Sequence, residues 1–181
     1  MSMSPRPGGF HGEFLWELEI VERQLIALVH AIPEEQYDWR PDATARSARE
    51  VFVHIASGNF MLLDVIGAPP PRDLYGEVIA QGPERLWALV RKNDELGASL
   101  RDKASVVSAL ERSLQSVRQP FTESDDGQLE RRLEFFGEQT TVRRVYLRLL
   151  AHMHEHMGQM IAYVRCMGMP APWPDWRPDR R

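Results

Sequence analysis

The chain has little of several features that would reveal its class at once. It contains one cysteine, Cys166, among 181 residues, so no disulfide can form within the chain. Hydrophobic residues occur in short groups, and none approaches the roughly 18 consecutive apolar residues of a membrane-spanning helix. The first ten residues, MSMSPRPGGF, lack the apolar stretch of a signal peptide. These absences favour a cytoplasmic protein with no membrane partner.

An excess of positive charge is also missing. The chain has 22 Lys and Arg against 26 Asp and Glu, for a net charge of −4. Domains that bind nucleic acid usually carry a basic patch or stripe, so no nucleic-acid partner is expected. The 43% share of hydrophobic residues is that of an ordinary globular protein. We expect a single domain over residues 1–181, because one core can be built at this size.

Strand patterns are scarce, because runs of Val, Ile and Thr that alternate with polar residues are hard to find. Helical periodicity is common instead. Apolar residues recur every three or four positions in four segments: 11–31, from Ser47 to about 65, 83–117, and from Thr140 or Thr141 to about Met167. The pattern predicts an all-α fold, a four-helix bundle.

The connections between these segments are long. The breaks at 32–46 and 118–140 exceed what a tight hairpin needs, so at least one long crossover connection is expected. Residues 119–128 are predicted to form a loop. Ser47 followed by Glu50 has the spacing of a capping box, which marks the start of the second helix. The C-terminal segment 168–181 is rich in proline and is predicted to be an irregular tail.

The chemistry is concentrated in residues 149–160, LLAHMHEHMGQM, which hold three of the six histidines. On an ideal helix His156 lies about 40° from His152 and one turn along, and Gln159 and Tyr163 continue this polar seam. The seam lies within an apolar face. His154 lies about 200° from His152, so we expect it to point away into solvent.

Two histidines four residues apart can place their ring nitrogens on one metal ion, but a pair of hydrogen-bonded core histidines remains the alternative. A third ligand must come from elsewhere. His54 is the best candidate, because it lies on the apolar stripe of the second helix and Gly58, one turn on, leaves room beside it. His11 and His30 lie less centrally in their helix.

Three neutral imidazoles can hold a divalent ion and leave positions open to water or substrate. The residue set suits zinc or nickel best, with iron or manganese also allowed, and composition does not choose among them. Glu155 lies about 60° from the seam, where it can pair with Arg148. It and His154 are expected to face away from the ion, so no strong general base is evident. Cys166 is interpreted as a packing residue.

Two stretches resemble the DinB/YfiT-like superfamily. AHMHEHMGQMIAYVRCMGMPAPW is similar to the last helix of that family, and IPEEQYDWRPDATARSAREVFVHIASGNFMLL is similar to its linker and second helix. The resemblance implies a four-helix bundle of up-up-down-down character and a homodimer. It also implies a divalent-metal site with one histidine on the second helix and two on the fourth, which correspond to His54, His152 and His156.

The resemblance also implies classes of function. Some members of the family resemble metal-dependent hydrolases, and others are thiol transferases or isomerases. We therefore expect a metal-dependent enzyme that activates water or a low-molecular-weight thiol against a small-molecule substrate. Gln159 and Tyr163 are candidates for orienting substrate or a ligand histidine. The alternative is a non-catalytic, metal-binding or stress-related dimeric helical module.

Overall fold

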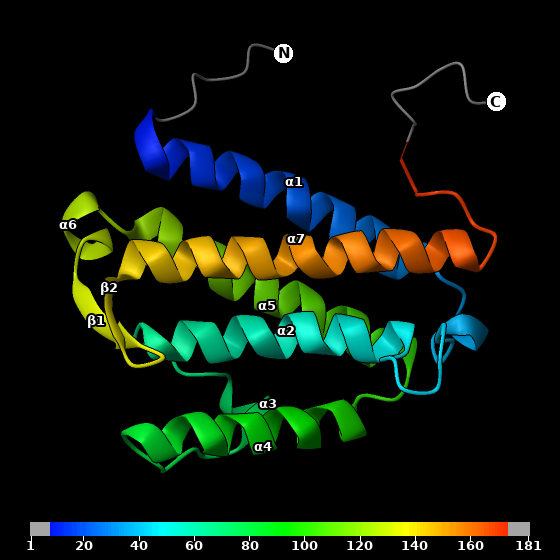
Figure 1. Cartoon of the computed structure of the whole chain (residues 1–181), viewed down its shortest axis with the longest axis horizontal. Helices are drawn as coiled ribbons and strands as arrows, with labels where there is room; N and C mark the ends of the chain where they lie inside the picture. Colours follow the sequence, from blue (N-terminus) through cyan, green and yellow to red (C-terminus); the bar gives the residue numbers. More distant parts are fainter. Residues whose placement is uncertain (1–7, 174–181) are drawn as a thin grey trace.

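The computed structural model describes residues 8–173. Four long helices form the predicted four-helix bundle: α1 (Gly9–Ala31), α2 (Ala48–Val65), α5 (Lys103–Glu123) and α7 (Val142–Cys166) (Figure 1). Each of α1 and α2 packs against both α5 and α7. Within the described residues, no helix combines the length and apolar character needed to cross a membrane.

The helices of the bundle run up-down-down-up in chain order. The end of α1 meets the start of α5, because Lys103 Nζ donates hydrogen bonds to the carbonyls of His30 at 2.8 Å and Ile32 at 2.7 Å. The end of α7 meets the start of α2, where the Tyr163 hydroxyl donates to the carbonyl of Arg46 at 3.0 Å. The up-up-down-down order implied by the family resemblance is therefore wrong. The neighbouring helices α2 and α5 run parallel, which requires the predicted long crossover.

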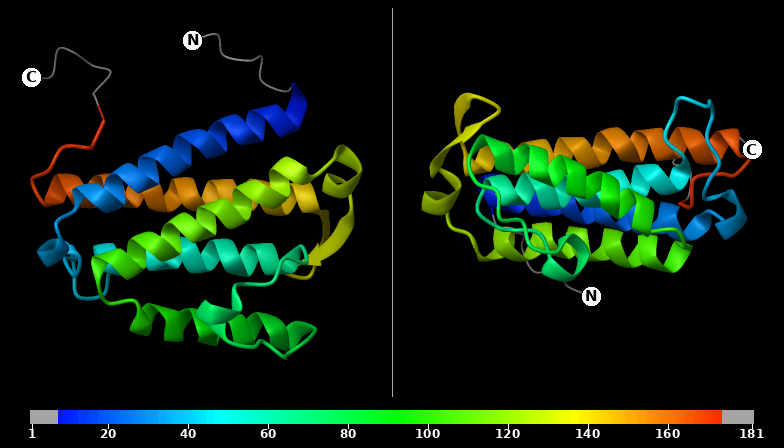
Figure 2. Two further views of the ribbon diagram at one scale, coloured as in Figure 1. Left: turned by 180° about the vertical axis from the view of Figure 1, so that it is seen from behind. Right: turned by 90° about the horizontal axis from the view of Figure 1, so that it is seen from below.

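That crossover contains an extra helix. The segment predicted as one helix over 83–117 is two helices, α4 (Pro83–Ser99) and α5, separated at Leu100–Asp102. The side chain of Asp102 caps α5 by accepting a hydrogen bond from the Ser105 amide at 2.8 Å. Leu100 is buried at this turn, so the apolar period continues across the break and conceals it. Together with the short α3 (Arg72–Tyr75), α4 leaves the bundle and packs on the outside of α2 (Figure 2).

The connection before α7 also differs from the prediction. The segment expected as a loop over 119–128 continues α5 through Pro120 to Glu123 and then forms the short α6 (Asp126–Leu129). A hairpin follows, in which β1 (Arg132–Phe135) pairs antiparallel with β2 (Glu138–Thr141). Its two turn residues, Phe136 and Gly137, both have positive φ angles, of 50° and 81°.

The helix ends near the histidines follow the sequence closely. Ser47 Oγ accepts from the Glu50 amide at 3.3 Å and the Glu50 carboxylate accepts from the Ser47 amide at 2.7 Å, which confirms the capping box. Between α1 and α2 lies only a short 3-10 turn, η1 (Glu34–Gln36). Thr141 caps α7, one of the two predicted starts. Residues 168–173 contain only turns and bends, and the remainder of the predicted tail lies outside the described residues.

A buried arginine fastens the outer helix to the bundle. Arg49 in α2 is 8% exposed. Its guanidinium donates to the carbonyls of Gly97 at 3.1 Å and Leu100 at 3.0 Å and to Asp38 at 2.9 Å. The two carbonyls belong to the end of α4, where no further helical turn supplies a donor. Arg49 therefore holds the end of α4 against α2.

We expect Arg49→Met to lower the free energy of unfolding by about 2–4 kcal/mol, because two buried carbonyls would lose a charged donor. Arg112→Met is the matched control, since Arg112 pairs with Asp73 at the surface with 43% of its side chain exposed. That change should cost less than about 1 kcal/mol. Urea unfolding of both variants measures the difference, and equal losses would contradict the role assigned to Arg49.

Candidate metal centre

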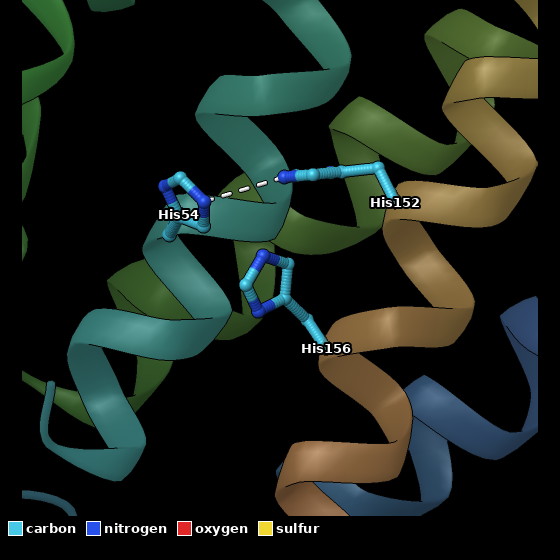
Figure 3. A group of neighbouring side chains, drawn as sticks. All are labelled: His54, His152 and His156. Atoms are coloured by element: carbon cyan, nitrogen blue, oxygen red, sulfur yellow. Dashed lines mark hydrogen bonds between the residues drawn. The ribbon is translucent and has the colours of Figure 1, made fainter. Parts of the chain in front are cut away.

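Three histidines from two helices meet in one cluster (Figure 3). His54 comes from α2, and His152 and His156 come from successive turns of α7. One ring nitrogen of each lies within 4.8 Å of the others, and all three side chains are half-buried. The structure therefore brings together the three residues that the sequence selected as candidate ligands.

The antiparallel packing of α2 and α7 creates this cluster. His152 and His156 are four residues apart, so both rings leave the same side of α7. His54 faces them across the helix interface, with its Nε2 atom 3.3 Å from Nε2 of His152. The His54 ring centroid is 5.0 Å from that of His152 and 4.6 Å from that of His156.

Gly58 is what allows the ring of His152 to lie against α2. A Cβ atom built on Gly58 would be 2.4 Å from Cε1 of His152, closer than side chains tolerate. We expected Gly58 to make room beside His54, one turn earlier on the same helix. The structure instead gives the space to His152, which arrives from the opposite helix. The sequence correctly indicated that Gly58 makes room for a histidine ring, but it did not reveal which histidine occupies that space.

The electrostatic surroundings keep two of the rings neutral. Burial, followed by the positive charge of Arg46, lowers the pKa of His54 to about 4. Burial, followed by the neighbouring His156 and His54, lowers the pKa of His152 to about 3. Near neutral pH both imidazoles are uncharged, which is the form that coordinates a metal ion.

From His156 onward, the polar seam predicted along α7 is a continuous chain of hydrogen bonds. Gln159 Oε1 lies 2.9 Å from Nδ1 of His156, and Gln159 Nε2 donates to the Tyr163 hydroxyl at 2.9 Å. The Tyr163 hydroxyl in turn donates to the carbonyl of Arg46. Because the amide oxygen accepts, Nδ1 of His156 is the donor of this bond, which leaves Nε2 as the nitrogen that can coordinate an ion. Gln159 and Tyr163 thus orient a histidine of the cluster.

The two polar neighbours of the seam lie outside the cluster. His154 is on the other side of α7, with Nε2 3.9 Å from a carboxylate oxygen of Glu17 and 34% of its side chain exposed. Glu155 is exposed and pairs with Arg148, as its helical position predicts. Its charge nevertheless reaches the cluster and slightly opposes the lowering of the His152 pKa. Glu155 therefore lies outside the cluster, as expected, and acts on it only through its charge.

The remaining candidates have other surroundings. His11 lies 3.0 Å from the carbonyl of Phe121 and stacks on that ring, and His30 lies 4.0 Å from Glu111. Cys166 is exposed at the end of α7, so the expectation that it packs in the interior is wrong. It lies ten residues beyond His156, about 15 Å along the helix, and takes no part in the cluster.

The arrangement suits a metal ion better than a pair of hydrogen-bonded core histidines. Among the described residues, the only partner of Nε2 of His152 is the Nε2 atom of another imidazole, that of His54. Two nitrogens at 2.0–2.1 Å from a tetrahedral zinc ion are about 3.3 Å apart, as are Nε2 of His54 and His152. His54, His152 and His156 therefore fit a divalent ion by donor type and by spacing.

A cavity of about 430 Å³ opens beside His54, between α2 and α4. Besides His54, its wall includes Ser57 from α2 and Asn93 from α4, together with charged side chains from both helices. The sequence prediction missed this cavity, because α4 was not recognised as a separate helix lying outside the bundle. Of the three histidines, His54 lines the cavity, so a small molecule bound there would contact the cluster at His54.

Comparisons with known proteins agree with the fold. The model of the DinB superfamily matches residues 17–160, and no curated protein matches the chain. YfiT from Bacillus subtilis, described as a probable metal-dependent hydrolase with an unusual four-helix bundle topology, is similar at 17% identity, with a TM-score of 0.61 over 93% of this chain and 95% of that one. A DinB-like protein from Bacillus cereus is similar at 18% identity, with a TM-score of 0.56 over 90% and 95% of the two chains. At such identities the likeness to these structures concerns the fold alone.

We expect Gly58→Ala to weaken zinc binding and to lower the free energy of unfolding of the metal-free protein by roughly 1–3 kcal/mol, because the new methyl group displaces His152. Gly158→Ala is the matched control, since a Cβ there meets no atom within 4 Å. Because Gly158 lies in a helix interior, Gly158→Ala should raise the free energy of unfolding by about 0.5–1 kcal/mol. Urea unfolding and zinc titration measure both effects. Equal changes in stability and zinc affinity in the two variants would contradict the close approach of His152 to Gly58.

Proposed function

The chain belongs to the DinB superfamily, and we propose that it is a divalent-metal-dependent enzyme whose ion is held by His54, His152 and His156. The observation that carries the proposal is the meeting of these three side chains beside a cavity of about 430 Å³. Zinc or nickel suits three imidazoles best, and iron or manganese is also compatible. Three protein ligands leave a position for water or substrate, as catalytic sites do.

A bound divalent ion would lower the pKa of water or of a thiol and would polarise a carbonyl group of the substrate. The chain supplies the surroundings for this chemistry. His54 and His152 remain neutral and able to coordinate at physiological pH. Gln159 holds the ring of His156 so that Nε2 faces the cluster, and Tyr163 holds Gln159.

The nucleophile is water or a low-molecular-weight thiol. Its oxygen or sulfur forms a bond to an electrophilic carbon of the substrate, the bond to the leaving group breaks, and the proton of the nucleophile passes to the leaving group. Within the described residues the cluster contains histidines alone, without a carboxylate that could act as a dedicated base. This favours a thiol, which ionises more readily than water. The description of YfiT as a probable metal-dependent hydrolase favours water instead.

A non-catalytic role is the second candidate. In that case the ion would stabilise a dimeric bundle or take part in a response to stress, as metals in bundle cores can be structural. The cavity beside His54 favours the enzyme, because a purely structural ion is normally enclosed by four protein ligands. The homodimer and the cytoplasmic location remain predictions of the sequence.

The proposal is tested with zinc-loaded and chelated protein on two substrate panels. One contains chromogenic esters and anilides, and the other combines low-molecular-weight thiols with an electrophilic acceptor. We expect turnover on one panel that disappears on chelation and returns with added zinc. Removal of partners that only orient metal ligands typically costs 10–100-fold, so His54→Ala or His152→Ala should cost more than about 100-fold in kcat/KM.

His154→Ala is the matched control for these variants, because His154 lies in the same helix but outside the cluster. Its turnover should stay within about twofold of the unmodified protein, since surface substitutions rarely disturb a folded domain. Activity that survives chelation would exclude a metal-dependent reaction. An equal loss in His154→Ala and His152→Ala would show that the helix as a whole, and not the cluster, is being perturbed.

A further inference from the structure

The cavity beside His54 is lined by charged side chains whose roles can be separated. Three arginines and two carboxylates lie on its wall: Arg46, Arg49, Arg101, Glu50 and Asp94. Arg49 is committed to Asp38 and to the end of α4. Glu50 is committed to the capping box of α2 and also faces Arg40 at 3.5 Å. Neither is available to a ligand without loss of structure.

Arg46 and Arg101 are the two cations that remain. Both are exposed at the cavity. Arg101 uses Nε to donate to the carbonyl of Ala98 at 2.8 Å, and its two terminal nitrogens make no hydrogen bond within residues 8–173. The guanidinium of Arg46 likewise has no carboxylate partner in that range. Other exposed arginines, such as Arg72 and Arg165, also have no carboxylate partner in that range, so the feature that distinguishes Arg46 and Arg101 is that both line the same cavity.

Arg46 is also tied to the histidine cluster through its backbone. Its carbonyl accepts a hydrogen bond from Tyr163, which accepts one from Gln159, which in turn holds His156. The backbone of Arg46 is therefore linked to the ring of His156 by three consecutive hydrogen bonds, and the charge of its side chain is felt at His54. A group bound by the Arg46 side chain would therefore lie near the metal ligands.

We propose that Arg46 and Arg101 bind a carboxylate of the substrate and so place its reacting group at the three-histidine cluster. Guanidinium groups recognise carboxylates with paired, charge-assisted hydrogen bonds, which give orientation as well as affinity. Asp94 is the one uncommitted carboxylate on the wall. It would accept a hydrogen bond from an amine or hydroxyl of the same molecule. The inference rests on the proposed function and assigns it a substrate class, small carboxylic acids with a nearby hydrogen-bond donor.

A suitable probe is 3-hydroxypropionate, which carries one carboxylate and a hydroxyl donor. Its uncharged amide, 3-hydroxypropanamide, is the isosteric control, and both are titrated into zinc-loaded and zinc-free protein and followed by NMR. We expect 3-hydroxypropionate to bind at least about tenfold more tightly than its amide, because only the carboxylate makes charge-assisted bonds to arginine. Arg46→Gln and Arg101→Gln should each weaken binding of 3-hydroxypropionate by about tenfold, the loss of roughly one such bond. Arg91→Gln, an exposed arginine of α4 off the cavity wall, should leave binding unchanged.

Zinc content is measured on every variant, and Arg46→Gln and Arg101→Gln should retain the zinc of the unmodified protein. Equal affinity for 3-hydroxypropionate and its amide would overturn the proposal, and so would binding of 3-hydroxypropionate that neither substitution weakens. Binding that requires zinc but neither arginine would place the carboxylate on the ion and would also overturn it. If zinc-free protein still binds 3-hydroxypropionate through Arg46, the carboxylate subsite is supported even if the metal assignment fails, so the two failures are distinguishable.

Discussion

The close approach of α2 and α7 at Gly58 is the constraint on which the candidate centre depends. The ring of His152 occupies the space where any other residue at position 58 would place its Cβ atom. Only this approach lets Nε2 of His152 reach within 3.3 Å of Nε2 of His54. The result is a half-buried imidazole whose Nε2 faces the Nε2 atom of another imidazole. A ligand role accounts for this arrangement, because a metal ion would engage the three rings together.

The surroundings of the cluster form one connected unit. The seam from His156 through Gln159 and Tyr163 ends at the backbone of Arg46, directly before the cap of α2. The same end of α2 carries Arg49, which holds α4 in place as the outer wall of the cavity. The helix outside the bundle therefore bears on the proposed function, since it supplies the outer wall of the cavity that His54 lines.

Helical phase allowed much of the site to be predicted from the sequence. It separated His152 and His156 from His154, placed Gln159 and Tyr163 on the same seam, and selected His54 as the third member. Helical phase could not predict features that depend on contacts between distant segments. The break between α4 and α5 was hidden because Leu100 continues the apolar period, and the hairpin was missed because its turn is Phe-Gly and not the usual Asn-Gly. The direction of each helix and the identity of the histidine that packs on Gly58 depend on which helices become neighbours. The apolar periodicity of a sequence does not encode this.

Zinc K-edge X-ray absorption on protein purified without a polyhistidine tag tests the central claim most directly. With one zinc ion per chain, we predict three imidazole nitrogens at about 2.0 Å and at least one further ligand from solution, an oxygen or a thiol sulfur. His54→Ala should reduce the imidazole count to two. A spectrum that is unchanged in His54→Ala, or less than one ion per chain in the unmodified protein at saturating zinc, would contradict the assignment of the three histidines as a metal centre.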